Sequence, residues 1–291
     1  MAELNLHIGV YNHLNGGIDH GAAGGAGALD RLERLDRLER LDRQLGLLAS
    51  LELDVLISTE AKGWFEPDDA PLKLAAARLG MTPLWVRAPR HDCNIVIWIN
   101  PRRLHHPEQH HETHHPFWHA QARTSVRVED LDERLWLFGA HFSPFVPQIR
   151  VQEAYATCDL ADGRLTIGGG DFNDDGLADP IPDRSGLPAY KRLRHMRPGG
   201  ESAASVLHAA ELHDMAALLE PMTTSRQPTA GFEDDAPIRC DRLYVCQRLR
   251  ETPRTFSTLP YDAALSDHRG IHGTLDLSAM TKGAPRFRET P

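Results

Sequence analysis

The most informative part of the chain reads Ile167-Gly168-Gly169-Gly170-Asp171-Phe172-Asn173-Asp174. It follows a short β-prone run that begins at Leu165, which predicts the end of a buried strand. Three consecutive glycines allow a sharp turn and the close approach of a substrate. If the chain stays extended, Asp171 and Asn173 share one side, because side chains alternate with a period of two.

A carboxylate and a carboxamide held side by side suit a hard cation with a phosphate oxygen beside it. The acid binds the metal and the amide donates a hydrogen bond to the oxygen. The alternative is an ordinary turn, because Asn, Asp and Gly favour turns through local hydrogen bonds. The choice between a metal-binding site and an ordinary turn therefore depends on the polar residues elsewhere in the chain.

The composition is that of a globular protein with a substantial core: 291 residues, of which 41% are hydrophobic. The formal net charge of -9 gives no overall basic signature of nucleic-acid binding. It does not exclude a phosphodiester substrate, because a metal site is itself acidic. The four cysteines form no CxxC pair, so neither a zinc ribbon nor a disulfide framework is expected. We expect no signal peptide, no membrane span and a cytoplasmic location.

Polar residues recur where other predicted strands end. Apolar residues alternate from Leu4 to Tyr11, and further strands are expected at 53–58, 94–99 and 238–245, with a hairpin from 117–128 and 135–142. The polar residues at these ends, or just before the final strand, are Asn12, Glu60, His141, Asp241, Asp267 and His268. Because open α/β sheets bind ligands at strand ends, we expect these side chains to form one site.

A leucine-rich helix is expected at 29–48, which opens with two copies of Leu-Asp-Arg-Leu-Glu-Arg. Leucines at every third residue drift around a 3.6-residue helix instead of forming one stripe. This favours an ordinary covering helix over a partner-binding coiled coil. Shorter helices are expected at 71–79, 148–160 and 203–219.

The histidine-rich segment 105–119 has two interpretations. Imidazole is a common ligand of transition metals, which suggests a metal site. Adjacent histidine pairs in an irregular loop do not specify a closed ligand geometry, so a solvated loop is favoured. The basic residues between Arg184 and Arg197 are likewise interpreted as solvated surface charge, with phosphate binding as the alternative.

Gly-Asp-Phe-Asn at 170–173, Ser-Asp-His at 266–268 and Arg239-Cys240-Asp241 occur in an order that resembles the endonuclease/exonuclease/phosphatase superfamily, whose members include deoxyribonuclease I-like nucleases. The resemblance extends from about Leu4 to Leu277. It implies an α/β fold, a four-layer α/β/β/α sandwich of two mixed β-sheets flanked by helices. It also implies one catalytic domain over 1–278, followed by a C-terminal tail at 279–291.

The resemblance further implies a metal site. Glu60 would be the main metal carboxylate, with Asn12 and Asp267 completing the surroundings of Mg²⁺, for which Mn²⁺ is a possible substitute. Asn15 follows in the same motif and is the alternative to Asn12. No other cofactor is expected.

By the same resemblance, the catalytic residues would be Asp171, Asn173, His141, His268 and Asp241. Asp171 would orient or deprotonate the attacking water, and Asn173 would bind the scissile phosphate. His141 would donate to a phosphate oxygen. His268, oriented by Asp241, would act as an acid/base group or as a cationic phosphate clamp.

These expectations predict a Mg²⁺-dependent hydrolase acting on phosphoric ester bonds, in which an activated water attacks a phosphodiester in line. Nucleic acid, DNA or RNA, is the first substrate hypothesis, and no protein partner is predicted. The alternative within enzymes is a phosphatase or phosphodiesterase for a small metabolite or lipid head group. A third hypothesis is a catalytically inactive binding module. Aromatic residues beside the predicted site would either stack on bases or belong to the core: Trp64, Phe65, Phe142 and Phe145.

Overall fold

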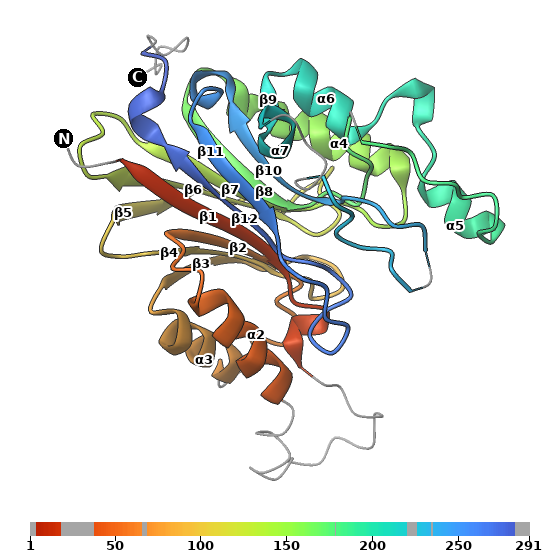
Figure 1. The fold of residues 1–291 in the computed structure, drawn as a ribbon, viewed down its shortest axis with the longest axis horizontal. Helices are drawn as coiled ribbons and strands as arrows, with labels where there is room; N and C mark the ends of the chain where they lie inside the picture. The colour runs from red at the N-terminus through yellow and green to blue at the C-terminus, as the bar shows by residue number, and fades with distance from the viewer. Residues whose placement is uncertain are drawn as a thin grey trace.

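Two β-sheets pack face to face in the computed structural model, which describes residues 4–18, 38–65, 69–177, 179–219, 226–233 and 235–282. Each sheet has six strands, and helices cover the two outer faces (Figure 1). Both sheets are mixed, because each contains one parallel pair of strands among antiparallel ones. The expected four-layer α/β/β/α sandwich is therefore confirmed.

The first sheet has the strand order β11-β12-β1-β2-β4-β3. Its strands are β1 (Asn5–Asn12), β2 (Val55–Thr59), β3 (Thr82–Val86), β4 (Ile95–Ile99), β11 (Pro253–Thr258) and β12 (Ile271–Asp276). The second sheet has the order β5-β6-β7-β8-β10-β9. Its strands are β5 (Leu104–Gln109), β6 (Gln121–Val128), β7 (Leu135–His141), β8 (Leu165–Asp171), β9 (Leu212–Asp214) and β10 (Asp241–Cys246).

Helices α2 and α3 cover the first sheet, and α4, α6 and α7 lie on the side of the second, while α5 extends away from it (Figure 1). The helices are α2 (Glu39–Ala49), α3 (Ala70–Leu79), α4 (Pro147–Thr157), α5 (Ala189–Arg194), α6 (Ala203–Ala209) and α7 (Met215–Leu218). Among the described residues, no helix has both the length and the apolar character needed to cross a membrane.

The core is built by strands whose two faces are both buried. In β4, Ile95 and Ile97 point into the core between the sheets, while Val96 and Trp98 point toward α2 and α3. Alternation places successive side chains on opposite faces, so a strand covered on both sides has no polar face. Leu45 of α2 packs against this outer face of the first sheet and is fully buried.

The leucine-rich segment matches its expectation where it is described. Helix α2 begins at Glu39, and it buries Leu41, Leu45 and Leu48 against the first sheet. It is therefore a covering helix in this part of the chain. Residues 29–37 lie outside the described part, as does most of the tail expected at 279–291.

Two expectations about secondary structure are wrong. The helix expected over 203–219 is interrupted, because α6 ends at Ala209 and Glu211 adopts a positive φ of 64° before β9 pairs with β10. The histidine-rich segment 105–119 is an irregular loop only from residue 110 onward, because Leu104–Gln109 forms edge strand β5 and pairs with β6. Strand β3 and strand β11 were not predicted at all.

The glycine run lies inside β8 and does not form a turn. A Cβ at Gly168 would overlap the ring of Phe138 on the neighbouring strand β7. Gly170 has a φ of +143°, and a Cβ there would overlap the carbonyl group of Ala140. The run therefore allows close packing of β7 on β8 just before Asp171, which reverses the expectation of a sharp turn open to substrate.

Candidate active site at the strand ends

The predicted site residues meet where strands of both sheets end. Asn12 ends β1, His141 ends β7 and Asp171 ends β8, while Glu60 directly follows β2. Asp171 pairs in register with His141 on one side and with Asp241 on the other. The sheet register thus fixes three of these side chains beside one another.

Asp171 lies at the centre of the site and is only 2% exposed. Its Oδ2 atom is 3.4 Å from Asn12 Nδ2, 3.6 Å from His141 Nε2 and 3.8 Å from His268 Nε2. Its Oδ1 atom accepts the backbone N–H of Asn173 at 2.9 Å. Residues from three other segments therefore converge on one carboxylate.

Glu60 faces the same space from the first sheet. Its Oε1 accepts the Asn12 amide at 3.2 Å, and its Oε2 accepts the backbone N–H of Asn15 at 2.9 Å. The Asn12 amide nitrogen thus links the carboxylates of Glu60 and Asp171, while its oxygen accepts the Leu14 N–H at 2.9 Å. This geometry favours Asn12 over Asn15 as the side chain that belongs to the site.

His268 is held from behind by Asp241. Its Nδ1 is 2.7 Å from Asp241 Oδ2, which leaves Nε2 facing Asp171. Ser266 fixes the loop, because its hydroxyl donates to the Asn12 carbonyl at 2.8 Å and accepts the His268 N–H at 3.1 Å. The Ser-Asp-His motif therefore ties the loop before β12 to the end of β1.

Asp171 and His268 form an ion pair. Burial alone would raise the pKa of Asp171, but the His268 and His141 rings outweigh it and hold this pKa below its ordinary value. Burial opposes the charged form of His268, yet Asp241 and then other acidic neighbours raise its pKa well above the ordinary value. At neutral pH the carboxylate is therefore ionised and the imidazole protonated.

We expect Asp241→Asn to lower the pKa of His268. The lost carboxylate stabilises the charged ring, so the variant should deprotonate at a lower pH than the wild type. The measurement is an NMR titration of the histidine ring protons, with the His268 signal assigned by a His268→Gln protein.

Asp235→Asn is the matched control. Asp235 accepts from His195 at 3.1 Å, so this variant should move the His195 titration and leave that of His268 in place. An unchanged His268 titration in Asp241→Asn would show that Asp241 does not hold the charge on the ring.

Asn173 lies where a substrate could reach it. It has a positive φ of 50°, and its side-chain amide donates to the Phe142 carbonyl at 3.0 Å, which leaves the second amide hydrogen for another acceptor. A cavity of about 130 Å³ is lined by Asn173 and His268 together with residues from α4, α5 and the loop at 230–240.

The backbone of Glu60, like that of Asn173, has a positive φ, of 54°. Strained backbone of this kind is common at functional sites.

The oxygen ligands beside Glu60 fit a hard divalent cation. Partial burial, together with repulsion from Glu60 and Asp171, raises the pKa of Asp267. Asp267 is thus close enough to Glu60 and Asp171 for their charges to disfavour its own. A divalent cation bound by oxygen atoms would relieve this repulsion.

Some neighbours of the site were not predicted. Thr229 accepts the backbone N–H groups of both Cys240 and Asp241, which anchors the start of β10. His119 stacks on His141 with ring centroids 4.3 Å apart, and burial lowers the pKa of His119 to about 2, so this ring is neutral. The Arg-Cys-Asp motif at 239–241 contains Cys240, but the motif predicts no role for its thiol. No periodic pattern in the sequence signals Thr229 or His119.

Aromatic and arginine side chains that are exposed or half-buried form a rim beside the site. Trp64, Phe65 and Phe142 are buried, so these three belong to the core, whereas Phe145 is 47% exposed. We define the rim by five residues whose side chains contact one another in sequence. These residues are Arg90, Trp118, Phe145, Arg194 and Tyr190. The guanidinium carbon of Arg90 is 4.9 Å from the ring centroid of Trp118, and the ring centroids of Trp118 and Phe145 are 6.4 Å apart. The guanidinium carbon of Arg194 is 4.9 Å from the ring centroid of Phe145 and 5.2 Å from that of Tyr190.

The basic segment is only partly solvated. Arg194 lies between Phe145 and Tyr190 in the rim, whereas Arg184 pairs with Asp175 at 2.5 Å. The histidines of β5 do not form a metal site, because in the described part of the chain no three of them bring ligand atoms together. His110 instead stacks on Trp136, with ring centroids 4.7 Å apart.

The sequence matches no protein-family model and no curated protein. The structure matches TDP2 of D. rerio humanized by 14 mutations, with a TM-score of 0.62 and 16% identity over 93% of this chain and 98% of that chain. D. rerio TDP2 complexed with a single strand DNA product gives 0.59 at 17% identity, with 93% and 98% covered. An endonuclease/exonuclease/phosphatase family protein from Bacteroides thetaiotaomicron gives 0.63 at 14%, with 94% and 98% covered. The expected resemblance is thus confirmed for the fold.

Proposed function

We propose that the protein is a Mg²⁺-dependent phosphodiesterase that cleaves nucleic acid. The observation that carries this proposal is the convergence of Asn12, His141 and His268 on the Asp171 carboxylate, at the edge where both sheets end. A carboxylate flanked by donors can position a water for in-line attack on phosphorus. The fold shared with TDP2 and with an endonuclease/exonuclease/phosphatase family protein is consistent with this chemistry and does not define the substrate.

Glu60 and Asp267 would hold the cation, and Asn12 would keep Glu60 and Asp171 together. A Mg²⁺ ion held there would neutralise charge on the phosphoryl oxygens and on the leaving oxygen, and Mn²⁺ could take its place. The carboxylates are positioned by hydrogen bonds from Asn12 and Asn15, so little reorganisation is needed.

The proton chemistry follows from the ion pair. Asp171 is ionised, so it can orient the attacking water or accept its proton. His268 is protonated, which supports a role as cationic donor to a phosphate oxygen or to the leaving oxygen, and not as a base. His141 and Asn173 lie beside Asp171 and can donate to the remaining phosphate oxygens.

The rim supports nucleic acid as the substrate. Bases stack on exposed aromatic rings, and arginines neutralise the phosphates between them. Phe145 and Tyr190 are 47% and 56% exposed, and Arg194 lies between them on the wall of the cavity that contains His268. D. rerio TDP2, which shares this fold, has been solved in complex with a single strand DNA product, and this is consistent with a nucleic acid substrate.

The test is cleavage of a single-stranded DNA oligonucleotide and of supercoiled plasmid with Mg²⁺ or with EDTA. We expect cleavage with Mg²⁺ and none with EDTA, because the proposed reaction requires a cation bound by the oxygen ligands beside Glu60. Phe145→Ala should raise the KM for the oligonucleotide about tenfold through lost stacking. The same variant should hydrolyse a small chromogenic phosphodiester as fast as the wild type, since that substrate does not reach the rim.

Tyr155→Ala is the control for the loss of an exposed aromatic ring, because Tyr155 lies on α4 and bonds Glu201. If the protein hydrolyses the small phosphodiester but does not cleave nucleic acid, the substrate is instead a small metabolite or a lipid head group. If folded protein hydrolyses neither substrate with Mg²⁺ or Mn²⁺, the proposed function is wrong.

A further inference from the structure

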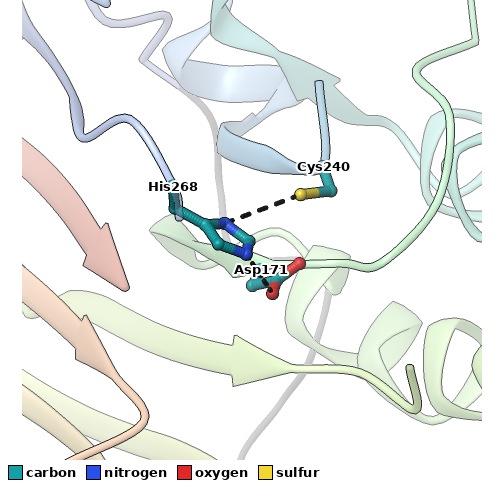
Figure 2. Close-up of side chains that lie close together, drawn as sticks. All are labelled: Asp171, Cys240 and His268. Atoms are coloured by element: carbon teal, nitrogen blue, oxygen red, sulfur yellow. Dashed lines mark hydrogen bonds and ion pairs between the residues drawn. The ribbon is translucent and has the colours of Figure 1, made fainter. Parts of the chain in front are cut away.

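A cysteine thiol lies in the middle of this site, although phosphodiester hydrolysis does not need one. Cys240 directly precedes β10, and its Sγ atom is 3.8 Å from His268 Nδ1 (Figure 2). One ligand atom each from Asp171, Cys240 and His268 lies within 4.8 Å of the other two. We call these three residues the thiol cluster. They come from the end of β8, the start of β10 and the loop before β12.

The thiol cluster offers sulfur, nitrogen and oxygen, a ligand set that differs from the oxygen ligands near Glu60. Hard Mg²⁺ prefers oxygen, whereas zinc-class cations bind thiolate and imidazole strongly. His268 Nε2 is 3.8 Å from Asp171 Oδ2, close to the separation of about 3.4 Å between nitrogen and oxygen ligands of one tetrahedral zinc ion. Cys240 Sγ lies on the Nδ1 side of the ring in this structure, so the thiol has to turn toward Nε2 to share one ion with Asp171 (Figure 2).

The surroundings of His268 match those of a metal-bound histidine. Such histidines usually donate their second ring N–H to a carboxylate, which fixes the tautomer and the ring orientation. Here Nδ1 lies 2.7 Å from Asp241 Oδ2, so Nε2 is the atom that faces Asp171. A cation has a route to the cluster, because Cys240 and His268 both line the cavity of about 130 Å³.

Packing alone explains the thiol less well. Cys240 Sγ donates a hydrogen bond to Asp241 Oδ2 at 3.5 Å and has a second hydrogen-bond contact with Thr229 Oγ1 at 3.7 Å. Both would also be available to a serine hydroxyl, and an aliphatic side chain would fill the same space. Strong binding of zinc-class cations is a property that sulfur has at this position and that a serine or an aliphatic residue lacks.

We propose that the thiol cluster is an inhibitory binding site for a zinc-class divalent cation, separate from the oxygen ligands beside Glu60. Binding forms a metal bond to Cys240 Sγ, to His268 Nε2 and to an Asp171 oxygen, and it releases the protons of the thiol and of Nε2 to solvent. It removes the ionised carboxylate and the protonated imidazole from the reaction. The inhibition rests on the proposed function, whereas the binding does not.

Cobalt is the probe for binding, because a Co²⁺–thiolate bond gives a near-ultraviolet charge-transfer band that oxygen and nitrogen ligands do not give. We expect the wild-type protein to show this band at one Co²⁺ per chain, and Zn²⁺ to abolish it by displacement. Cys240→Ser should lose the band, and Cys93→Ser, which removes another free thiol, should keep it. Absence of the band in the wild type, or its loss in Cys93→Ser, would overturn the proposal.

Inhibition is measured by adding Zn²⁺ to hydrolysis supported by excess Mg²⁺. Cys240→Ser should keep the basal rate and require at least about tenfold more Zn²⁺ for half inhibition. Cys240→Ala, checked for folding by circular dichroism, should behave in the same way. Equal Zn²⁺ sensitivity of wild type and both variants would refute an inhibitory role. If no hydrolysis is found at all, the proposed function fails, and the cobalt band still tests the site.

Discussion

Asp171→Asn should lower kcat/KM for phosphodiester hydrolysis by about 10³-fold, with a smaller change in KM. The substitution removes the ionised oxygen toward which Asn12, His141 and His268 point, and it places an amide N–H₂ group against these donors. Positioned proton acceptors of this kind contribute about 10²- to 10⁴-fold to a rate. Steady-state kinetics on the small chromogenic phosphodiester, where substrate binding by the rim plays no part, measures this loss directly.

Asp183→Asn is the control, because Asp183 is an exposed acid that bonds only the neighbouring Ser185 among the described residues. It should retain the wild-type rate. The melting temperatures of both variants should be compared, since Asp171 also accepts the Asn173 N–H and its loss affects packing. A folded Asp171→Asn protein with wild-type kcat would remove Asp171 from the reaction and, with it, the basis of the proposed function.

The interior strands could be predicted because burial on both faces leaves a clear pattern in the sequence. Ile95 to Ile99 is wholly apolar, since one face meets the second sheet and the other meets helices. The edge strands carry no such pattern. Strand β3 contains Pro83 and strand β5 contains Pro107 with several histidines, and edge strands tolerate proline and charge because one side forms no ladder.

The site could be predicted where a polar residue follows an apolar strand. Asn12, Glu60 and Asp171 all satisfy this rule, and the two sheets bring them within hydrogen-bonding distance. Residues that support the site do not satisfy it. Thr229 reaches Asp241 from a loop that is distant in sequence from most of the site, and Cys240 resembles any small apolar residue at the start of a strand.

The glycine run shows how a correct motif can carry a wrong local interpretation. Gly168 and Gly170 are required by the close approach of Phe138 and Ala140, which is a property of the neighbouring strand and not of the segment itself. Propensity alone indicates a turn for such a run. The close packing of β7 on β8 keeps the run extended instead, and the pairing of these strands places Asp171 directly beside His141.

Glu60→Gln should lower kcat/KM by about 10³-fold at a Mg²⁺ concentration that is limiting for the wild type, and excess Mg²⁺ should restore part of the loss. Glu60 is the carboxylate that both Asn12 and Asn15 orient, and its replacement removes a charge from the oxygen ligands of the cation. The amide nitrogen of glutamine would also face one of these two N–H donors. The loss should therefore come mainly from weaker metal binding, unlike the loss expected for Asp171→Asn.

Thermal unfolding separates these two causes without relying on activity. A cation that binds only the folded state raises the melting temperature, so Mg²⁺ should stabilise the wild type and stabilise Glu60→Gln much less. Glu52→Gln is the matched control, because Glu52 lines a separate cavity between α2 and α3 and should leave the Mg²⁺ response intact. If Glu60→Gln responds to Mg²⁺ as the wild type does, the cation is held elsewhere, and Asp267 with Asp171 becomes the next pair to test, since their charges already repel each other across the same site.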